Sequence, residues 1–246
     1  TRKILMFSFK KISNNFSIPI LSLKLSIKSF FIKRSFFYKY LIYIYYMSKY
    51  IENPYQIFRN IGLMIDEGVK NRKHGFHTPV FSNFSSQSKI NSRVIVLRNY
   101  DQENQILYFN TDVRSKKIKE IKNNPNTFFV FYDFKEKVQL RIETISIINH
   151  KNAISLKAWE KTKLSSRKCY LTTLAPGTNI DKPSDGIPQK YTGIEPKKNE
   201  TEIGYNNFSV IKNTIKKIEW LNLSSTGHRK LLIKLDKVRK YQWLIP

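Results

Sequence analysis

Basic and hydroxyl-bearing side chains gather in two short stretches of this sequence, at a spacing suited to binding a phosphate group. Arg93 and Arg98 enclose four apolar residues. Further along, Ser115-Lys116-Lys117 opens a segment in which Ile118 and Ile121 recur at helical spacing. The N-terminus of a helix attracts anions through its free N–H groups and its dipole, and lysines and hydroxyls add to this. The two stretches therefore predict a cradle for a phosphate-bearing cofactor.

A hairpin and a helix would position these side chains. Residues 93–98 and 107–111 are runs of strand-forming residues separated by the turn-like segment 101–104, which predicts two paired strands. The candidate caps of the helix that follows are Thr111, Asp112 and Ser115.

Apolar periodicity predicts the remaining elements. A strand over 138–149 would place Gln139 and Arg141 on one face, because side chains alternate along a strand. Further strands are expected within or after 76–84 and at 127–133, 218–223, 231–235 and 241–245. Helices are expected at 51–70 and at 151–163, the second with Ile154, Ala158 and Trp159 on its inner side. Residues 172–207 are rich in glycine and proline and lack a sustained period, which predicts a long loop.

The order of the motifs resembles the pyridoxamine 5'-phosphate oxidase family, whose members are FMN-binding split barrels. Family members carry a strand bounded by basic residues, an F-x-T motif, a serine with two basic residues at a helix start, an N-N-P motif, a buried strand and a flavin-contacting glutamine. The matching segments are Arg93 to Arg98, Phe109-Asn110-Thr111, Ser115-Lys116-Lys117, Asn123-Asn124-Pro125, Phe128 to Phe131, and Gln139. The resemblance implies an α+β, mainly β fold: a six-stranded antiparallel split barrel with flanking helices.

The resemblance also implies FMN as the cofactor. The cofactor-binding candidates in this part of the chain are Arg93, Val94, Ile95, Arg98, Thr111, Ser115, Lys116, Lys117 and Gln139. Arg93, Lys116 and Lys117 would bind the phosphate, next to the hydroxyls of Thr111 and Ser115. Val94 and Ile95 belong to the strand that runs along the flavin in the family. Arg98, at the end of that strand, would stabilise the reduced flavin anion.

Later segments resemble the family's C-terminal elements. Trp220 and His228 have the separation of a W-x7-H-x-R motif, with Lys230 in place of an arginine that reaches FMN. Leu164 to Arg167 is similar to a Q-S-S-R element and adds Ser165 to the cofactor-binding candidates. By this resemblance His228 and Arg98 are the catalytic candidates.

The sequence departs from pyridoxamine 5'-phosphate oxidases at the positions that hold their substrate. Thr226 replaces an arginine two residues before the C-terminal histidine. The family's Tyr-x3-Arg-x3-Ser phosphate clamp is replaced at best by Trp159, Lys163 and Arg167. The resemblance thus supports FMN as the cofactor more strongly than it supports a B6 vitamer as the substrate.

These features favour an FMN-dependent oxidoreductase with an unassigned small-molecule substrate, which transfers a hydride from that substrate to flavin N5. The family implies a homodimer with FMN at the subunit interface. The alternatives are a true pyridoxamine or pyridoxine 5'-phosphate oxidase, a non-catalytic flavin or haem-type binding module, and a basic nucleic-acid binder.

Charge bounds these alternatives. The 246-residue chain has a net charge of +26, which would suit nucleic acid or phosphorylated ligands. Much of the lysine is dispersed among Asn and Ile, which argues against a nucleic-acid surface. Residues 1–46 hold nine basic and no acidic residues, as a targeting peptide or translation upstream of Met47 would. The domain is accordingly expected at residues 47–246.

Few residue types remain for other chemistry. Cys169 is the single cysteine, so no intrachain disulfide is expected, and a cytoplasmic location or an organelle matrix fits. The four histidines lack partners at metal-ligand spacing, so no metal site is expected. No apolar run is long enough to predict a membrane-spanning helix.

Overall fold

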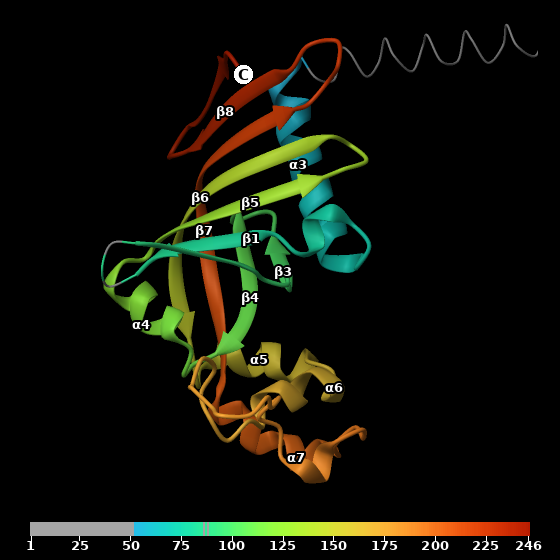
Figure 1. Ribbon diagram of the computed structural model, residues 1–246. Coiled ribbons are helices and arrows are strands. Elements are labelled where there is room, and N and C mark those ends of the chain that lie inside the picture. Colours follow the sequence, from blue (N-terminus) through green and yellow to red (C-terminus); the bar gives the residue numbers. More distant parts are fainter. Residues whose placement is uncertain (1–51, 86, 88) are drawn as a thin grey trace, which may run out of the picture. The chain divides into compact units, whose positions relative to one another are not determined.

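An antiparallel sheet with flanking helices forms the part of the chain described by the computed structural model, which is residues 52–85, 87 and 89–246 (Figure 1). The predictions for residues 1–46 lie outside the described residues. The strands are β1 (Val80–Phe84), β2 (Ile90–Val94), β3 (Asn99–Asp101), β4 (Ile106–Asp112), β5 (Asn126–Asp133), β6 (Val138–Asn149), β7 (Phe208–Asn222), β8 (Arg229–Leu235) and β9 (Arg239–Leu244). The α-helices are α3 (Pro54–Lys70), α4 (Lys116–Asn123), α5 (Ala153–Lys161), α6 (Leu164–Arg167) and α7 (Lys198–Thr201).

The sheet closes into a barrel through the chain itself. Its strand order is β2-β1-β5-β6-β7-β4-β3, so the two outermost strands are consecutive in the sequence. Residues 95–98 join them, leaving the edge of β1 and arriving at β4, where the Arg98 N–H donates to the Tyr108 carbonyl (2.9 Å). If β2 and β3 are taken as one interrupted strand, the barrel has six strands, as predicted. β8 and β9 extend the sheet to nine strands.

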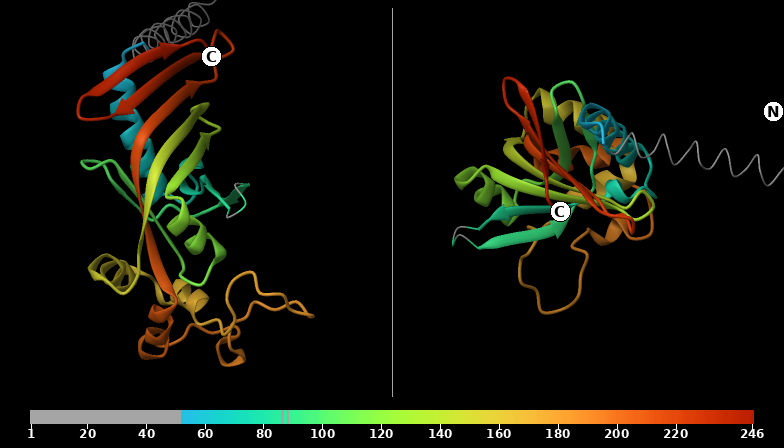
Figure 2. Two further views of the ribbon diagram at one scale, coloured as in Figure 1. Left: turned by 90° about the vertical axis from the view of Figure 1, so that its left-hand side faces the viewer. Right: turned by 90° about the horizontal axis from the view of Figure 1, so that it is seen from above.

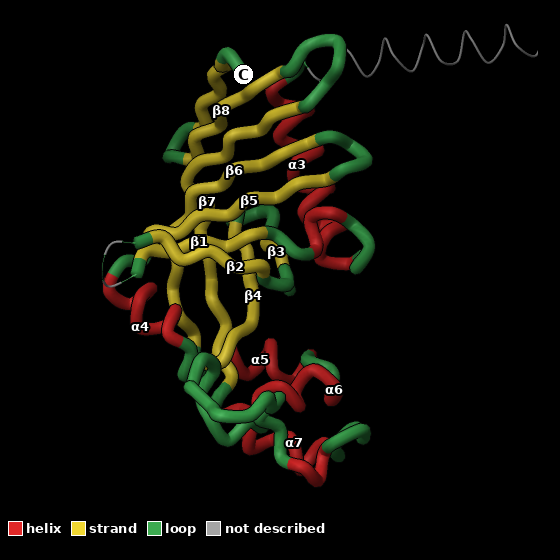
Figure 3. Tube along the Cα trace, in the orientation of Figure 1, coloured by secondary structure: helices red, strands yellow, loops and turns green. Residues whose placement is uncertain are grey.

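The long strand β7 produces the split in the barrel. It pairs with β6 along most of its length. On its other side, residues 208–214 pair with β4, whereas residues 217–222 pair with β8. The tube view shows β4 leaving the upper strands at this point (Figure 3). The predicted strand at 218–223 is therefore the second half of a strand that begins ten residues earlier.

The predicted strand over 93–98 is wrong beyond Val94, where β2 ends. The Ile95 N–H donates to the Pro79 carbonyl (3.0 Å), but proline has no N–H to return. The Leu97 N–H donates to the His77 carbonyl (3.0 Å), while the His77 N–H is already bonded to the His74 carbonyl. Residues 95–97 therefore donate hydrogen bonds to residues 77–79 without receiving any in return, and the chain can leave this edge and pair with β4 at Arg98.

Aromatic side chains fill the barrel. Phe81 lies 4.9 Å from Phe109 and 5.1 Å from Phe129, measured between ring centroids, and all three are fully or almost fully buried. Phe76 and Phe131 extend this cluster (5.2 Å). These rings come from β1, β4 and β5 and from the segment before β1, so they join strands that are distant in sequence.

Helix α3 covers the extended end of the sheet. The helix was predicted, and Ile57, Ile61 and Ile65, which recur at helical spacing, form its buried side. On β9, Tyr241 packs against Tyr55 of this helix at 5.0 Å between ring centroids. No helix in the described ranges is long and apolar enough to cross a membrane.

Helix α5 begins at a capping box in which Asn152 accepts from the Ser155 N–H (3.0 Å). Trp159 is buried as predicted, but Ile154 is not on the inner side, since it is 39% exposed. Ser155 takes the inner position and bonds to the Tyr205 hydroxyl (2.9 Å).

Residues 172–207 form an excursion with short helical turns and no strand (Figure 2). Both ends are bound to one turn of the barrel. The Arg114 guanidinium donates to the Thr172 carbonyl (3.1 Å) and hydroxyl (2.8 Å). The Val113 N–H donates to the Asn207 carbonyl (2.8 Å).

Truncation of Leu97 tests the closure of the barrel. Leu97 is 1% exposed, so Leu97→Ala should lower the free energy of unfolding by about 3 kcal/mol, as expected for a core cavity. Val94→Ala is the matched control, because Val94 is 63% exposed and its truncation should cost less than about 0.5 kcal/mol. If denaturant unfolding gave the same loss of unfolding free energy for both variants, residues 95–98 would have no role in closing the barrel.

Candidate functional site: an anion cradle beside helix α4

Arg93, Thr111 and Lys117 converge from β2, β4 and the first turn of α4. The Lys117 ammonium donates to the Thr111 hydroxyl (2.9 Å). Burial lowers the pKa of Lys117, and the positive charge of Arg93 lowers it further. Burial also lowers the pKa of Arg93. Two desolvated cations that repel each other form a site whose charge favours an anion. We call these three residues the cradle.

Ser115 completes this end of the cradle at the N-cap of α4, as predicted. It is buried, and its hydroxyl makes no capping hydrogen bond to the helix. Among the first N–H groups of α4, that of Ile118 donates to the Ser115 carbonyl (2.9 Å), whereas those of Lys116 and Lys117 have no acceptor within the helix and can serve a ligand.

Lys116 points away from the cradle. Its side chain is 79% exposed, and its ammonium lies 4.0 Å from Glu120 Oε1. The expectation that Lys116 and Lys117 act together on a phosphate is therefore not matched by their positions, because neighbouring helical residues project about 100° apart.

The structure adds three polar residues that the sequence analysis missed: Asn83, Asn91 and Glu120. The Arg93 guanidinium donates to the Asn83 side-chain carbonyl. Glu120, on α4, accepts from Asn83 Nδ2 and from Asn91 Nδ2, each at 2.8 Å. The sequence could have indicated Asn91, because it lies two residues before Arg93 and so faces the same side of the strand. Asn83 pairs with Asn91 across the two strands and faces that side as well.

Gln139 lies on the other face of the sheet. Strand pairing runs from Tyr132 through Gln139 and Leu221 to Lys230, so the four side chains share one row of the outer face. In the next row, Val94 is linked through β1 and β5 to Arg141. Val94, Gln139 and Lys230 therefore share a face, which we call the outer face, while Arg93 projects inward over the Phe81 ring (5.7 Å).

Lys230 already has a counter-ion. Its ammonium lies 3.6 Å from Glu219 Oε2, and the same carboxylate is 3.2 Å from the Arg141 guanidinium. An anionic ligand at Lys230 would compete with this pair.

The other candidates are dispersed within the single chain. Trp220 is 1% exposed and packs in the core, so its ring is not open to a ligand. His228 is exposed in the turn between β7 and β8, where its Nδ1 accepts from the Ser224 N–H (3.1 Å). Ile95 is partly buried, and Arg98 and Ser165 are exposed.

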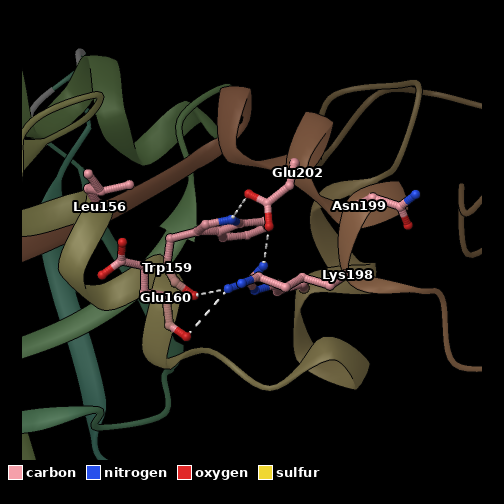
Figure 4. Close-up of a pocket in the computed structure, with 7 residues that line it drawn as sticks. Leu156, Trp159, Glu160, Lys198, Asn199 and Glu202 are labelled. Carbon is pink, nitrogen blue, oxygen red and sulfur yellow. Dashed lines mark hydrogen bonds and ion pairs between the residues drawn. The ribbon is translucent and has the colours of Figure 1, made fainter.

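A cleft of about 610 Å³ lies between α5 and α7 (Figure 4), and none of the cradle residues lines it. Arg167 lines the cleft, and each of its five N–H groups is hydrogen-bonded within the protein. Its guanidinium donates to the carbonyls of Thr162, Trp159 and Glu160 and to the side chains of Thr201 and Glu202. Glu202 also accepts from Trp159 Nε1 (3.0 Å), a hydrogen bond that lowers its pKa ahead of the effect of Arg167. Arg167 therefore has no N–H left for a substrate phosphate, in line with the departure from the family's clamp at this position.

In the described ranges, no three His, Cys, Asp or Glu residues lie close enough to hold a metal ion. Cys169 is exposed and unpaired.

Comparison with known proteins agrees with the motifs and the fold. Residues 63–149 match the family described as Pyridoxamine 5'-phosphate oxidase, FMN-binding domain. No curated protein matches the chain. Among solved structures, a pyridoxamine 5'-phosphate oxidase-related, FMN binding protein from Nostoc punctiforme PCC 73102 aligns with a TM-score of 0.62 and 16% identity, covering 79% of this chain and 98% of that one.

A second solved structure is PhzG from Burkholderia lata 383 in complex with tetrahydrophenazine-1-carboxylic acid. It aligns with a TM-score of 0.58 and 15% identity, covering 79% of this chain and 93% of that one. At these identities the likeness shows the fold, which is the α+β, mainly antiparallel split barrel predicted from the sequence.

Replacement of Lys117 tests the cradle. Lys117→Met should weaken FMN binding by about 10- to 100-fold, because a charged hydrogen bond contributes about 1.5–3 kcal/mol. The melting temperature of the cofactor-free protein should stay the same or rise, since burial and Arg93 disfavour the ammonium. In the wild type, FMN affinity should fall as pH rises through the lowered pKa of Lys117, because the neutral amine no longer attracts phosphate.

Lys119→Met is the matched control for this prediction. Lys119 lies on the same helix but is exposed, so its loss removes one charge without touching the cradle. Equal FMN binding by the Lys117 and Lys119 variants, measured by fluorescence titration, would contradict a phosphate at Lys117.

Proposed function

Because residues 63–149 belong to the pyridoxamine 5'-phosphate oxidase FMN-binding domain family, we propose that this protein binds FMN and acts as an FMN-dependent oxidoreductase on a small molecule. The observation that carries the proposal is the cradle, together with Ser115 and the N-terminus of α4 beside it. They offer two half-buried cations, two hydroxyls and the first N–H groups of a helix, a donor set suited to a phosphate monoester.

Different residues of the chain would bind the phosphate of FMN and contact its ring. Arg93 and Lys117 would bind the phosphate, and their partial burial would strengthen the attraction between the charges. Bound FMN supplies hydride acceptance at N5. Arg98, which is exposed at the end of the segment 95–98, would stabilise negative charge on the reduced ring. His228 would hold or move a proton at its imidazole.

A homodimer is part of the proposal. The outer face carries Gln139 and Lys230 together with exposed apolar side chains, Val94 at 63% and Tyr132 at 44%. A second copy packed on this face would cover those apolar groups and bring its Gln139, Lys230 and His228 towards the cofactor. Glu219 would then have to release Lys230 or share it.

The narrower activity, oxidation of a phosphorylated B6 vitamer, has less support. That substrate needs its own phosphate clamp, but Arg167 has no free N–H. Thr226 stands where the family has an arginine, and its hydroxyl bonds to Ser224 (2.8 Å) in an exposed turn. A non-catalytic flavin-binding module would share the cradle and differ only in lacking turnover.

Flavin titration tests the proposal. Purified protein from residue 47 onward should show bound-flavin absorption or quench added FMN fluorescence at micromolar or lower concentration. Arg93→Gln should weaken FMN by about 10- to 100-fold and leave riboflavin, which lacks the phosphate, unchanged. Arg72→Gln, an exposed position near the end of α3, is the matched control and should bind FMN normally.

Two outcomes would reject the proposal. Wild-type protein that neither contains flavin nor alters FMN fluorescence would exclude the cofactor. Steeply salt-dependent binding to DNA or RNA, unaffected by Lys117→Ala, would instead favour the nucleic-acid alternative.

A further inference from the structure

Glu120 is a buried carboxylate directly behind the cradle. It lies on α4 and is 3% exposed, although its neighbours on the buried side of the helix are Ile118 and Ile121. A buried charge is costly unless it is hydrogen-bonded and paired. Glu120 meets this condition through two asparagine amides and the nearby charges of Arg93 and Lys117.

The hydrogen bonds form a relay from Glu120 to Arg93. A carboxylate only accepts, so Asn83 must direct its NH2 group towards Glu120 (2.8 Å). The amide oxygen of Asn83 is then fixed on the opposite side, where it accepts from Arg93 Nη1. Asn83 also donates to the Phe84 carbonyl (3.0 Å), and it is 3% exposed, so it has little freedom to turn.

The relay leaves the rest of the Arg93 guanidinium open. Only Nη1 has a hydrogen-bond acceptor among the described residues, so Nε and Nη2 remain available for an anion. An arginine that is held on one side and open on the other is oriented before its ligand arrives, which reduces the entropy lost on binding.

We propose that Glu120, acting through Asn83, is a positioning residue that sets the orientation of Arg93 towards the phosphate of FMN. This inference rests on the proposed function, because the phosphate is the group that Arg93 would bind. Glu120 does not touch the ligand itself.

Two charge-preserving variants separate positioning from simple electrostatics. Glu120→Asp keeps the negative charge but withdraws the carboxylate by one methylene, beyond reach of Asn83. Asn83→Ala removes the link without any change of charge. Each should weaken FMN binding about tenfold, a typical cost for the loss of a supporting partner, and leave riboflavin binding unchanged. The double variant should be no weaker than either single one, because both break the same relay.

The controls address folding and charge. Glu67→Asp makes the same change at an exposed carboxylate on α3, whose partner is Asn71 (3.0 Å), and should bind FMN as the wild type does. In an Arg93→Gln background, Glu120→Asp should have no further effect on FMN. Riboflavin affinity reports whether the rest of the site has kept its shape.

Three outcomes would overturn a positioning role for Glu120. They are wild-type FMN affinity in Glu120→Asp, additive losses of FMN affinity in the double variant, and a loss of riboflavin affinity equal to that of FMN. If the wild type itself does not bind FMN, the proposed function fails instead, and that outcome is separate because it is seen before any variant is measured.

Discussion

The closure of the barrel by residues 95–98 is the constraint on which the rest of the structure depends. Two strands that are adjacent in sequence lie on opposite edges of the sheet, so the chain must release one neighbour and take up another within four residues. Pro79 makes the release possible because it cannot return a hydrogen bond. The crossing leaves Arg93 on one side and brings β4, with Thr111 at its end, to the other. The site therefore forms as a result of topology, before any side chain contributes affinity.

Two arginines differ in how much of their hydrogen-bonding capacity the protein itself uses. Arg167 is buried and has every N–H satisfied by the protein, so it ties α5, α6 and α7 together. Arg93 is only partly buried and bonds to the protein through one nitrogen. The same residue type thus differs in its free hydrogen-bonding capacity, and the cleft beside Arg167 offers no guanidinium N–H to an anion.

The sequence predicted the elements whose apolar pattern is regular, such as β6 and the start of α4. It failed where the deciding partner is remote: the end of β2 at Val94 depends on Pro79 and on a hydrogen bond of His77. The early start of β7 was hidden by Asn213, a fully buried amide that donates to the Leu107 carbonyl (2.9 Å) and interrupts the apolar alternation. Glu120 was missed because a charged helical residue is ordinarily solvated. Polar residues inside the barrel therefore account for much of what pattern alone could not find.

The attachment of residues 172–207 also bears on how such a chain can diverge. Both ends of this excursion are fixed to the turn at Val113 and Arg114. The entropy of closing a loop between fixed ends grows only with the logarithm of its length. Residues can therefore be gained or lost in the middle of the excursion at little thermodynamic cost to the barrel. The turn between Thr111 and Lys117 thus serves as an attachment point, where new sequence can be introduced close to the cradle while the strands that build it stay unchanged.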